Sequence, residues 1–222
     1  MTVPQEDAET IRVLQGLEDS RPSVRLRVTL AVGTSPDPRF VGTLVARCAV
    51  EPDFQVREAL TWALTRHPAS TTVPALLEEV RSERAQARSQ ALHTLSKIGD
   101  RSAWPVITPA LLSDADDEVA RSAWRAAVAL VPEGEEPGLA TALAARLGRG
   151  GRDMRLSLSR ALTALGEVIV PLLAAAAAAP DPRVRAHAIA TERLLRDPDA
   201  GFEPAVEEAK RVVALGATGR EG

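Results

Sequence analysis

The residues of this chain that could do chemistry are few and far apart in the sequence. Its three histidines, His67, His93 and His187, occur singly, none followed by Glu and no two spaced four apart as on one helix face. Such spacing is what a helical metal site needs. Cys48 is the only cysteine, so neither an intramolecular disulfide nor a thiolate cluster can form. We therefore expect no metal, no cofactor and no catalytic centre.

A second group of residues has the composition of a binding surface. When the helices that share a recurring motif are aligned at 100° per residue, a tryptophan and several cations fall on one exposed face. Tryptophan and arginine give large contact energies when they are desolvated, so they are typical of binding hot spots. The alternative is that the tryptophan packs between helices and the arginines form a solvated face. The predicted partner-binding strip on the concave face comprises Trp62, His93, Lys97, Arg121, Arg125 and Arg160.

Other conspicuous side chains have simpler interpretations. Trp124 is expected to pack against the next repeat, and Trp104 precedes a proline as a hydrophobic staple does. His67 lies on an apolar helix stripe, which favours a role in the core or at the helix end. Cys48 falls in a first helix of a repeat and is expected to be a small buried hydrophobe.

Composition favours closely packed helices. Of 222 residues, 45% are apolar and only 3% aromatic, with no tyrosine. The net charge of −3 argues against a ligand that is bound mainly through its phosphates, since such domains are usually basic. The longest apolar run, 169–180, is too short and too rich in alanine to span a bilayer. We expect no membrane contact and, because no signal peptide is visible in the acidic first residues, a cytoplasmic protein.

The elements that must position these residues are tandem repeats. The motif of 180–188, Pro-Asp-Pro-Arg-Val-Arg-Ala-His-Ala, returns with changes along the whole chain. A helix-starting register runs through Gly42, Pro74, Pro105, Gly138, Pro171 and Pro204 at spacings of 31 to 33 residues. The arginine of Val-Arg gives a second register at Arg25, Arg57, Arg88, Arg155 and Arg185, with Ala120 in place of the fourth arginine.

Each repeat of this length holds two helices of about three turns and a tight turn. A period of this length without strand signals is typical of a solenoid, in which each unit buries its apolar stripe against its neighbours. We predict one domain over 1–215 and a disordered tail over 216–222. The expected helices are 6–18, 22–34, 38–49, 53–67, 72–81, 84–98, 103–113, 116–131, 138–147, 152–166, 168–179, 182–196 and a last, unpaired helix near 203–215.

The turn Asp181-Pro182-Arg183-Val184-Arg185 and its looser copies resemble the HEAT repeat, and most closely the short prokaryotic kind also found in phycobilin lyases. The resemblance covers about residues 5–215. It implies an all-α, right-handed solenoid of about six helical hairpins plus a C-terminal capping helix, with the second helices lining a concave face. It also implies ladders between units that are formed by turn aspartates and helix arginines. Carried over, the ladder residues are Asp53, Arg57, Arg88, Arg155, Asp181 and Arg185, although Arg84 and Gly151 stand at the acid's position in two copies.

The sequence leaves three functions open. The first is a non-catalytic scaffold that binds a protein, or an acidic or extended peptide, on its concave strip. The second is nucleic-acid binding, because some DNA glycosylases resemble this architecture, although their concave surface is far more basic. The third, a chromophore or cofactor lyase, follows only from the resemblance to bilin lyases, and no residues here reproduce a tetrapyrrole pocket.

Overall fold

A computed structural model describes residues 5–197, 205–207 and 209–212, with side chains described from residue 10 onward. Throughout these residues the regular structure is helical, with short 3-10 segments beside the α-helices. The prediction of an all-α fold built from helical hairpins is confirmed. No helix in the described ranges has the length and apolar character needed to cross a membrane. The predicted tail, 216–222, lies outside the described residues.

Contacts divide the chain into two compact units, residues 1–106 and residues 107–222. The single domain expected over 1–215 stays a prediction. Each unit has three helical hairpins, and within each unit the second helices of successive hairpins pack side by side. This is the arrangement of stacked repeats that the sequence period predicts.

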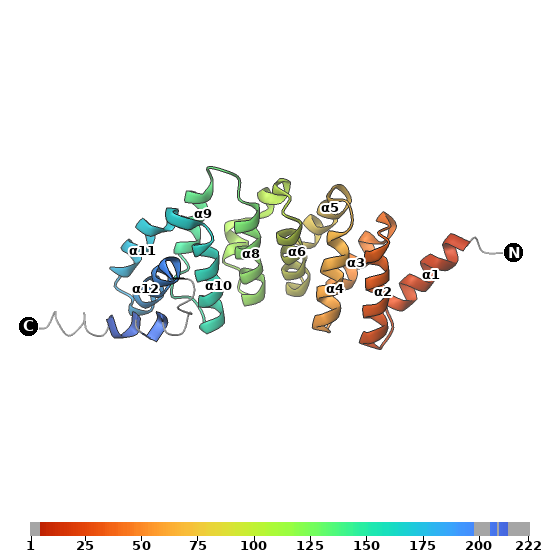
Figure 1. Ribbon diagram of the computed structural model, residues 1–222, viewed down its shortest axis with the longest axis horizontal. Helices are drawn as coiled ribbons and strands as arrows, with labels where there is room; N and C mark the ends of the chain where they lie inside the picture. The colour runs from red at the N-terminus through yellow and green to blue at the C-terminus, as the bar shows by residue number, and fades with distance from the viewer. Residues whose placement is uncertain (1–4, 198–204, 208, 213–222) are drawn as a thin grey trace, which may run out of the picture. The chain divides into compact units, whose positions relative to one another are not determined.

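The first unit contains three successive hairpins, α1 with α2, α3 with α4, and α5 with α6 (Figure 1). The second helices pack in the order α2, α4, α6. The apolar stripe expected on α4 is buried, with Val56, Leu60 and Leu64 at 0% exposure. The helices of this unit are α1 (Gln5–Leu17), α2 (Pro22–Thr34), α3 (Val41–Cys48), α4 (Phe54–Thr65), α5 (Ala69–Glu79) and α6 (Ala85–Ile98), with 3-10 segments η1 (Pro38–Phe40) and η2 (Arg101–Val106).

The second unit repeats this arrangement with α7 and α8, α9 and α10, and α11 and α12. Its second helices pack in the order α8, α10, α12. Its helices are α7 (Pro109–Leu112), α8 (Asp117–Leu130), α9 (Glu136–Ala144), α10 (Arg152–Thr163), α11 (Val170–Ala177) and α12 (Pro182–Arg196), with η3 (Gly166–Ile169) before α11. Helical residues 205–207 and 209–212 follow within the region expected for the last helix.

Two of the predicted first helices differ from the structure. The helix expected over 103–113 is wrong: η2 and the short α7 occupy this region, separated by two non-helical residues. Pro109 favours extended backbone in the residue before it, and Thr108 has ψ 156°. Helix α5 begins at Ala69, three residues earlier than expected, so that Pro74 lies inside the helix. Prolines recur with the repeat, but they do not always mark a helix start.

Aspartates cap the N-termini of three of the second helices, α4, α8 and α12. The side chain of Asp53 accepts a hydrogen bond from Val56 N at 3.1 Å, and that of Asp181 accepts one from Arg183 N at 2.8 Å. Asp116 caps α8 in the same way through Glu118 N and Val119 N. These carboxylates satisfy N–H groups that have no partner within the helix.

The arginines of the second register close the turn of their own hairpin. Arg57 Nη1 donates to the carbonyls of Glu51 and Pro52, which stand six and five residues before it. The same two bonds are made by Arg25, Arg88 and Arg185, with all distances between 2.7 and 3.1 Å.

The hydrogen bonds described above for the expected ladder residues run within single hairpins, and the ladder between hairpins stays a prediction for Asp53, Arg57, Arg88, Arg155, Asp181 and Arg185. The aspartates point at the start of their own helix, and three of the arginines point at the carbonyls of their own turn. Arg155 makes no such bond among the described residues, and the stretch five and six residues before it is the glycine-rich turn of 148–151. The recurrence of the arginines is explained by turn closure within each hairpin.

The hairpin of α7 and α8 lacks this arginine, and another residue makes its bond. Ala120 stands where an arginine would donate to the carbonyl of Asp114, six residues earlier. Arg149, in the turn between α9 and α10, donates to that same carbonyl. Its guanidinium also lies 6.0 Å from the centre of the buried Trp124 ring and 3.4 Å from Asp117. The longer turn of 148–151 thus supplies from the next hairpin the contact that Ala120 cannot make.

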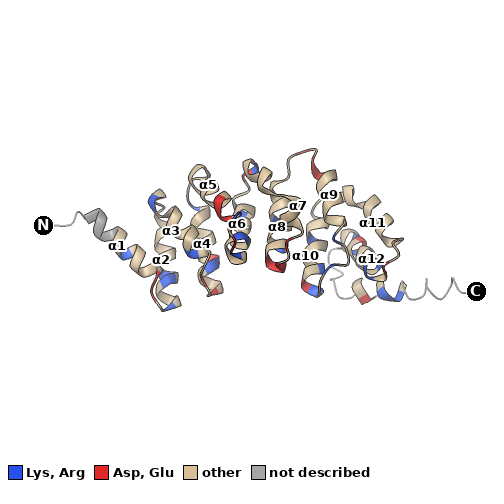
Figure 2. Ribbon diagram, turned by 180° about the vertical axis from the view of Figure 1, so that it is seen from behind, with Lys and Arg blue, Asp and Glu red and all other residues tan. Residues whose placement is uncertain are grey.

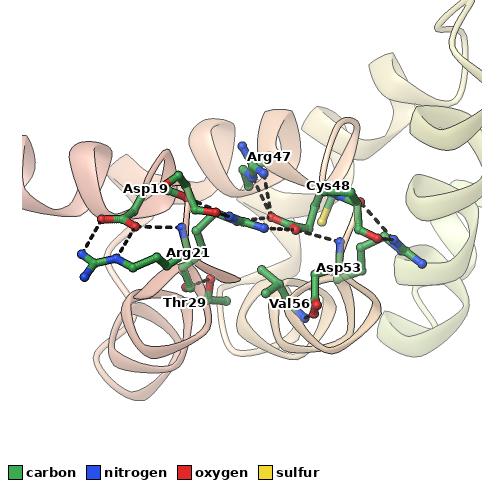
Figure 3. A network of polar contacts seen from close by, with 12 residues as sticks. Asp19, Arg21, Thr29, Arg47, Cys48, Asp53 and Val56 are labelled. Atoms are coloured by element: carbon green, nitrogen blue, oxygen red, sulfur yellow. Dashed lines mark hydrogen bonds and ion pairs between the residues drawn. The ribbon is translucent and has the colours of Figure 1, made fainter. Parts of the chain in front are cut away.

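The ionic connection between the first two hairpins is centred on Glu51, which the sequence reasoning passed over. Its carboxylate is fully buried and accepts hydrogen bonds from Arg25 Nε and Nη2, both at 2.7 Å. Arg47 Nε at 2.8 Å and the backbone N–H of Asp53 at 2.9 Å complete the site (Figure 3). Burial would raise the pKa of Glu51, but these bonds lower it to about 2. Gln86 of α6 donates to the Glu51 carbonyl and so attaches the third hairpin.

Candidate functional site

Three members of the predicted strip lie together in the second unit. Arg121, Arg125 and Arg160 line a groove of about 370 Å³ between α8 and α10. Figure 2 colours the basic residues of these two helices blue. The other lining residues, in chain order, are Val128, Asp153, Leu156, Ser157, Ala161 and Ala164.

Helical spacing explains why these three arginines converge. Arg121 and Arg125 are four residues apart on α8, and Arg160 occupies on α10 the repeat position that Arg125 occupies on α8. Residues four apart share one helix face, and α8 and α10 pack directly against each other. The apolar sides of the same helices are buried, which turns the arginines outward.

The groove combines positive charge with an apolar surface. Three guanidiniums face it, against the single carboxylate of Asp153. Arg121 lies 3.0 Å from Glu118, and Arg125 donates to the Ser122 hydroxyl at 3.0 Å. The exposed guanidinium of Arg160 makes no hydrogen bond or ion pair within the described residues. A carboxylate that enters the groove would therefore meet a cation that has no partner of its own.

The other three strip residues belong to the first unit and have different surroundings. Trp62 on α4 is 40% exposed, and its ring packs on α2 so closely that a Cβ on Gly33 would lie 2.3 Å from it. His93 on α6 is half-buried, with Nε2 3.5 Å from a Glu58 carboxylate oxygen. Lys97 on α6 is exposed. Both interpretations of Trp62 thus keep some support, because it packs between helices and also has an exposed part. A role for these residues in binding stays a prediction.

One serine and one histidine lie as close as a nucleophile and its base, but the hydrogen bonds exclude that role. His187 Nε2 lies 3.0 Å from Ser159 Oγ and from the carbonyl of Arg155. Its Nδ1 accepts the N–H of Gly148 at 3.0 Å, so in the neutral ring the proton is on Nε2. Such a ring cannot take the proton of Ser159. Burial lowers the pKa of His187 to about 4, and the exposure of Ser159 is 0%, so the pair belongs to the core.

The remaining candidates for chemistry are structural as well. His67 is buried, with its ring nitrogens at 2.9 Å from the Ala63 carbonyl and 3.2 Å from the Asp37 carbonyl, as expected for a core residue. Cys48 is buried and its pKa is raised to about 12 by that burial, so it stays a protonated thiol. Trp124 is fully buried and donates to the Leu112 carbonyl of its own hairpin. No group of histidine, cysteine and acidic side chains in the described residues is arranged to hold a metal.

The sequence reasoning missed the apolar part of the groove and its serine. Val128, Ala161 and Ala164 were not singled out in the sequence. Leu156 could have been found from the sequence, because it occupies on α10 the repeat position that Arg121 occupies on α8.

A family model described as HEAT repeats matches residues 43–130. The predicted resemblance to HEAT repeats is confirmed by this match, which runs from α3 to the end of α8. No curated protein matches the sequence.

Solved structures with similar folds are distant in sequence. An engineered protein is 16% identical with a TM-score of 0.48, over 94% of this chain and 97% of that one. Human deoxyhypusine hydroxylase in complex with glycerol is 20% identical with a TM-score of 0.46, over 94% and 95%. The complex of CpcE and CpcF of phycocyanin lyase from Nostoc is 17% identical with a TM-score of 0.38, over 90% and 93%. Likenesses this distant carry nothing about function.

Proposed function

We propose that this chain, which contains HEAT repeats, is a non-catalytic scaffold that binds an acidic protein segment in the groove between α8 and α10. The observation that carries the proposal is the convergence of Arg121, Arg125 and Arg160 on an apolar-lined groove, with Arg160 making no side-chain bond in the described part of the chain. Guanidiniums beside apolar surface favour a ligand that offers carboxylates and apolar side chains together.

Charge supports a protein ligand over a nucleic acid. The whole chain carries a net charge of −3, and Asp153 lies in the groove itself. A nucleic acid held through its backbone would need a run of cations along a longer surface. A short positive groove on an acidic chain instead suits a local acidic segment, for which charge aids encounter and apolar contact adds affinity.

The proposal is tested by affinity capture with charge-reversed variants. The groove variant is Arg125→Glu/Arg160→Glu. The matched control, Arg66→Glu/Arg81→Glu, reverses two exposed arginines of the first unit and changes the net charge equally. Partners are captured from lysate and identified by mass spectrometry. We expect proteins held by the wild-type chain and the control to be lost from the groove variant.

Two results would contradict the proposal. Capture profiles that are the same for all three proteins would show that the groove is not the binding surface. Duplex DNA that binds the wild-type chain with steep salt dependence, and not the groove variant, would identify the ligand as nucleic acid.

A further inference from the structure

The C-terminal helix of this chain covers the same repeat positions that form the groove. Ala205 and Ala209 are buried and pack with Ala190 of α12, which is fully buried. Ala190 stands one repeat after Arg160, and Ala186 stands one repeat after Leu156. Helical residues near the end of the described chain thus pack, through alanines spaced four apart, on the repeat position that carries Arg125 and Arg160 in the two preceding repeats.

The covered patch and the open groove are continuous on α10. Leu156 lines the groove and also packs against the cluster that contains Ala205 and Ala209. Both regions therefore lie on one face of the second helices within the second unit. They differ in charge, because the covered repeat has Ala186 and Ala190 where the open one has Leu156 and Arg160.

We propose that the groove binds an amphipathic α-helix of a partner protein, with small apolar side chains on Val128 and Leu156 and carboxylates toward Arg125 and Arg160. This inference rests on the proposed function and names the form of its ligand. The C-terminal helix shows how the face receives a helix, namely through small residues at i and i+4. The groove differs from the covered patch by its guanidiniums, so a partner helix that binds beside them must carry acidic residues on its flank.

The probes are three fluorescent peptides that are tested on the full chain by fluorescence anisotropy. The first is an 18-residue lactam-stapled helix with alanine and leucine on one face and glutamate on both flanks. The second has the same composition and no staple, in an order that removes the apolar face. The third is the first peptide with lysine in place of glutamate. The proteins are the wild-type chain, Arg125→Glu/Arg160→Glu, and the control Arg66→Glu/Arg81→Glu.

We expect the acidic helix to bind the wild-type chain and the control at least about tenfold more tightly than the scrambled peptide. The groove variant should lose at least about tenfold in affinity for the acidic helix and should gain binding of the lysine helix. Recovery by the reversed charge pair would show that the variant is folded and that charge at these two positions selects the ligand.

The failures of this inference and of the proposed function are distinguishable. Equal binding of the acidic helix and the scrambled peptide, both weakened in the groove variant, would overturn the helical ligand and leave the acidic segment standing. Captured partners that depend on the groove, with no binding of the acidic helix, would also overturn the helical ligand alone. If Arg125→Glu/Arg160→Glu changes neither the affinity for the peptides nor the set of captured proteins, both the helical ligand and the proposed function are overturned.

Discussion

At the scale of single residues, the arginines of this chain differ in what their guanidiniums bond to. Arg57 and its equivalents close a turn by donating to two carbonyls. Arg25 does the same and also forms a buried bidentate ion pair with Glu51. Arg160 has an exposed guanidinium that makes no hydrogen bond or ion pair within the described chain. The planar, always charged guanidinium suits each of these arrangements, and the neighbouring atoms decide between them.

Glu51→Gln should be strongly destabilising. The substitution leaves the charges of Arg25 and Arg47 beside a neutral amide in a buried site, and breaking a buried ion pair of this kind costs about 3 kcal/mol or more. The free energy of unfolding, measured in urea at pH 7, would fall by that amount. The control Glu78→Gln, whose side chain is 78% exposed, should change it by less than about 0.5 kcal/mol. Equal values for the two variants would contradict the role given to Glu51.

The sequence predicted which positions recur but not which atoms they contact. Asp53 and Arg57 were expected to belong to a ladder between hairpins because the resemblance to HEAT repeats implies one. A repeat register cannot distinguish a contact within a hairpin from one between hairpins, since both recur with the same period. Glu51 escaped notice because the other repeats have no buried glutamate at its place, although its spacing of four from Arg47 was visible.

At the scale of helices and turns, the glycine-rich turn of 148–151 has a structural function. Arg149 in this turn donates to the carbonyl of Asp114 and so replaces the arginine missing at Ala120. Gly148 donates its N–H to His187 of α12 at 3.0 Å. The turn therefore connects the hairpins before and after its own. These contacts depend on packing between repeats, which a repeat pattern in the sequence does not reveal.

Arg149→Ala should lower the free energy of unfolding by about 1–2 kcal/mol, because it leaves the Asp114 carbonyl without its donor and removes the cation from the Trp124 ring. In this background Ala120→Arg restores the residue type of the other repeats and should recover at least half of the loss. Arg152→Ala, which changes an exposed arginine at the start of α10, is the control and should have little effect. If Ala120→Arg recovers none of the free energy of unfolding lost in Arg149→Ala, Arg149 does not replace the arginine missing at position 120.

His187 makes the second unit sensitive to acid. Burial lowers its pKa from 6.5 to about 4, so between these values the unfolded chain binds a proton that the folded chain does not. Stability from this residue is therefore full above about pH 6.5 and falls as the pH drops toward 4, by up to about 3 kcal/mol. Urea unfolding from pH 7 to pH 4 measures the decline. His187→Asn should flatten the slope in this window, and an unchanged slope would show that His187 is not its source.

At the scale of the whole chain, helix positions were predictable and their partners were not. The repeat period and the register of prolines and glycines placed most of the helices within a few residues of their bounds. The helix expected over 103–113 failed because Pro105 and Pro109 interrupt it, a local effect that the repeat period concealed. The arginines of the groove were predicted from one helix wheel applied to each repeat. The apolar lining of the groove was missed, because a helical wheel projects a single helix and the groove is formed between two.

The most direct test of the central claim is the dissociation constant of a captured, purified partner. It is measured with the wild-type chain, with Arg125→Glu/Arg160→Glu and with the control Arg66→Glu/Arg81→Glu. If the groove between α8 and α10 is the binding surface, the groove variant binds at least about tenfold more weakly and the control binds as the wild type does. Equal dissociation constants for all three proteins would contradict the account.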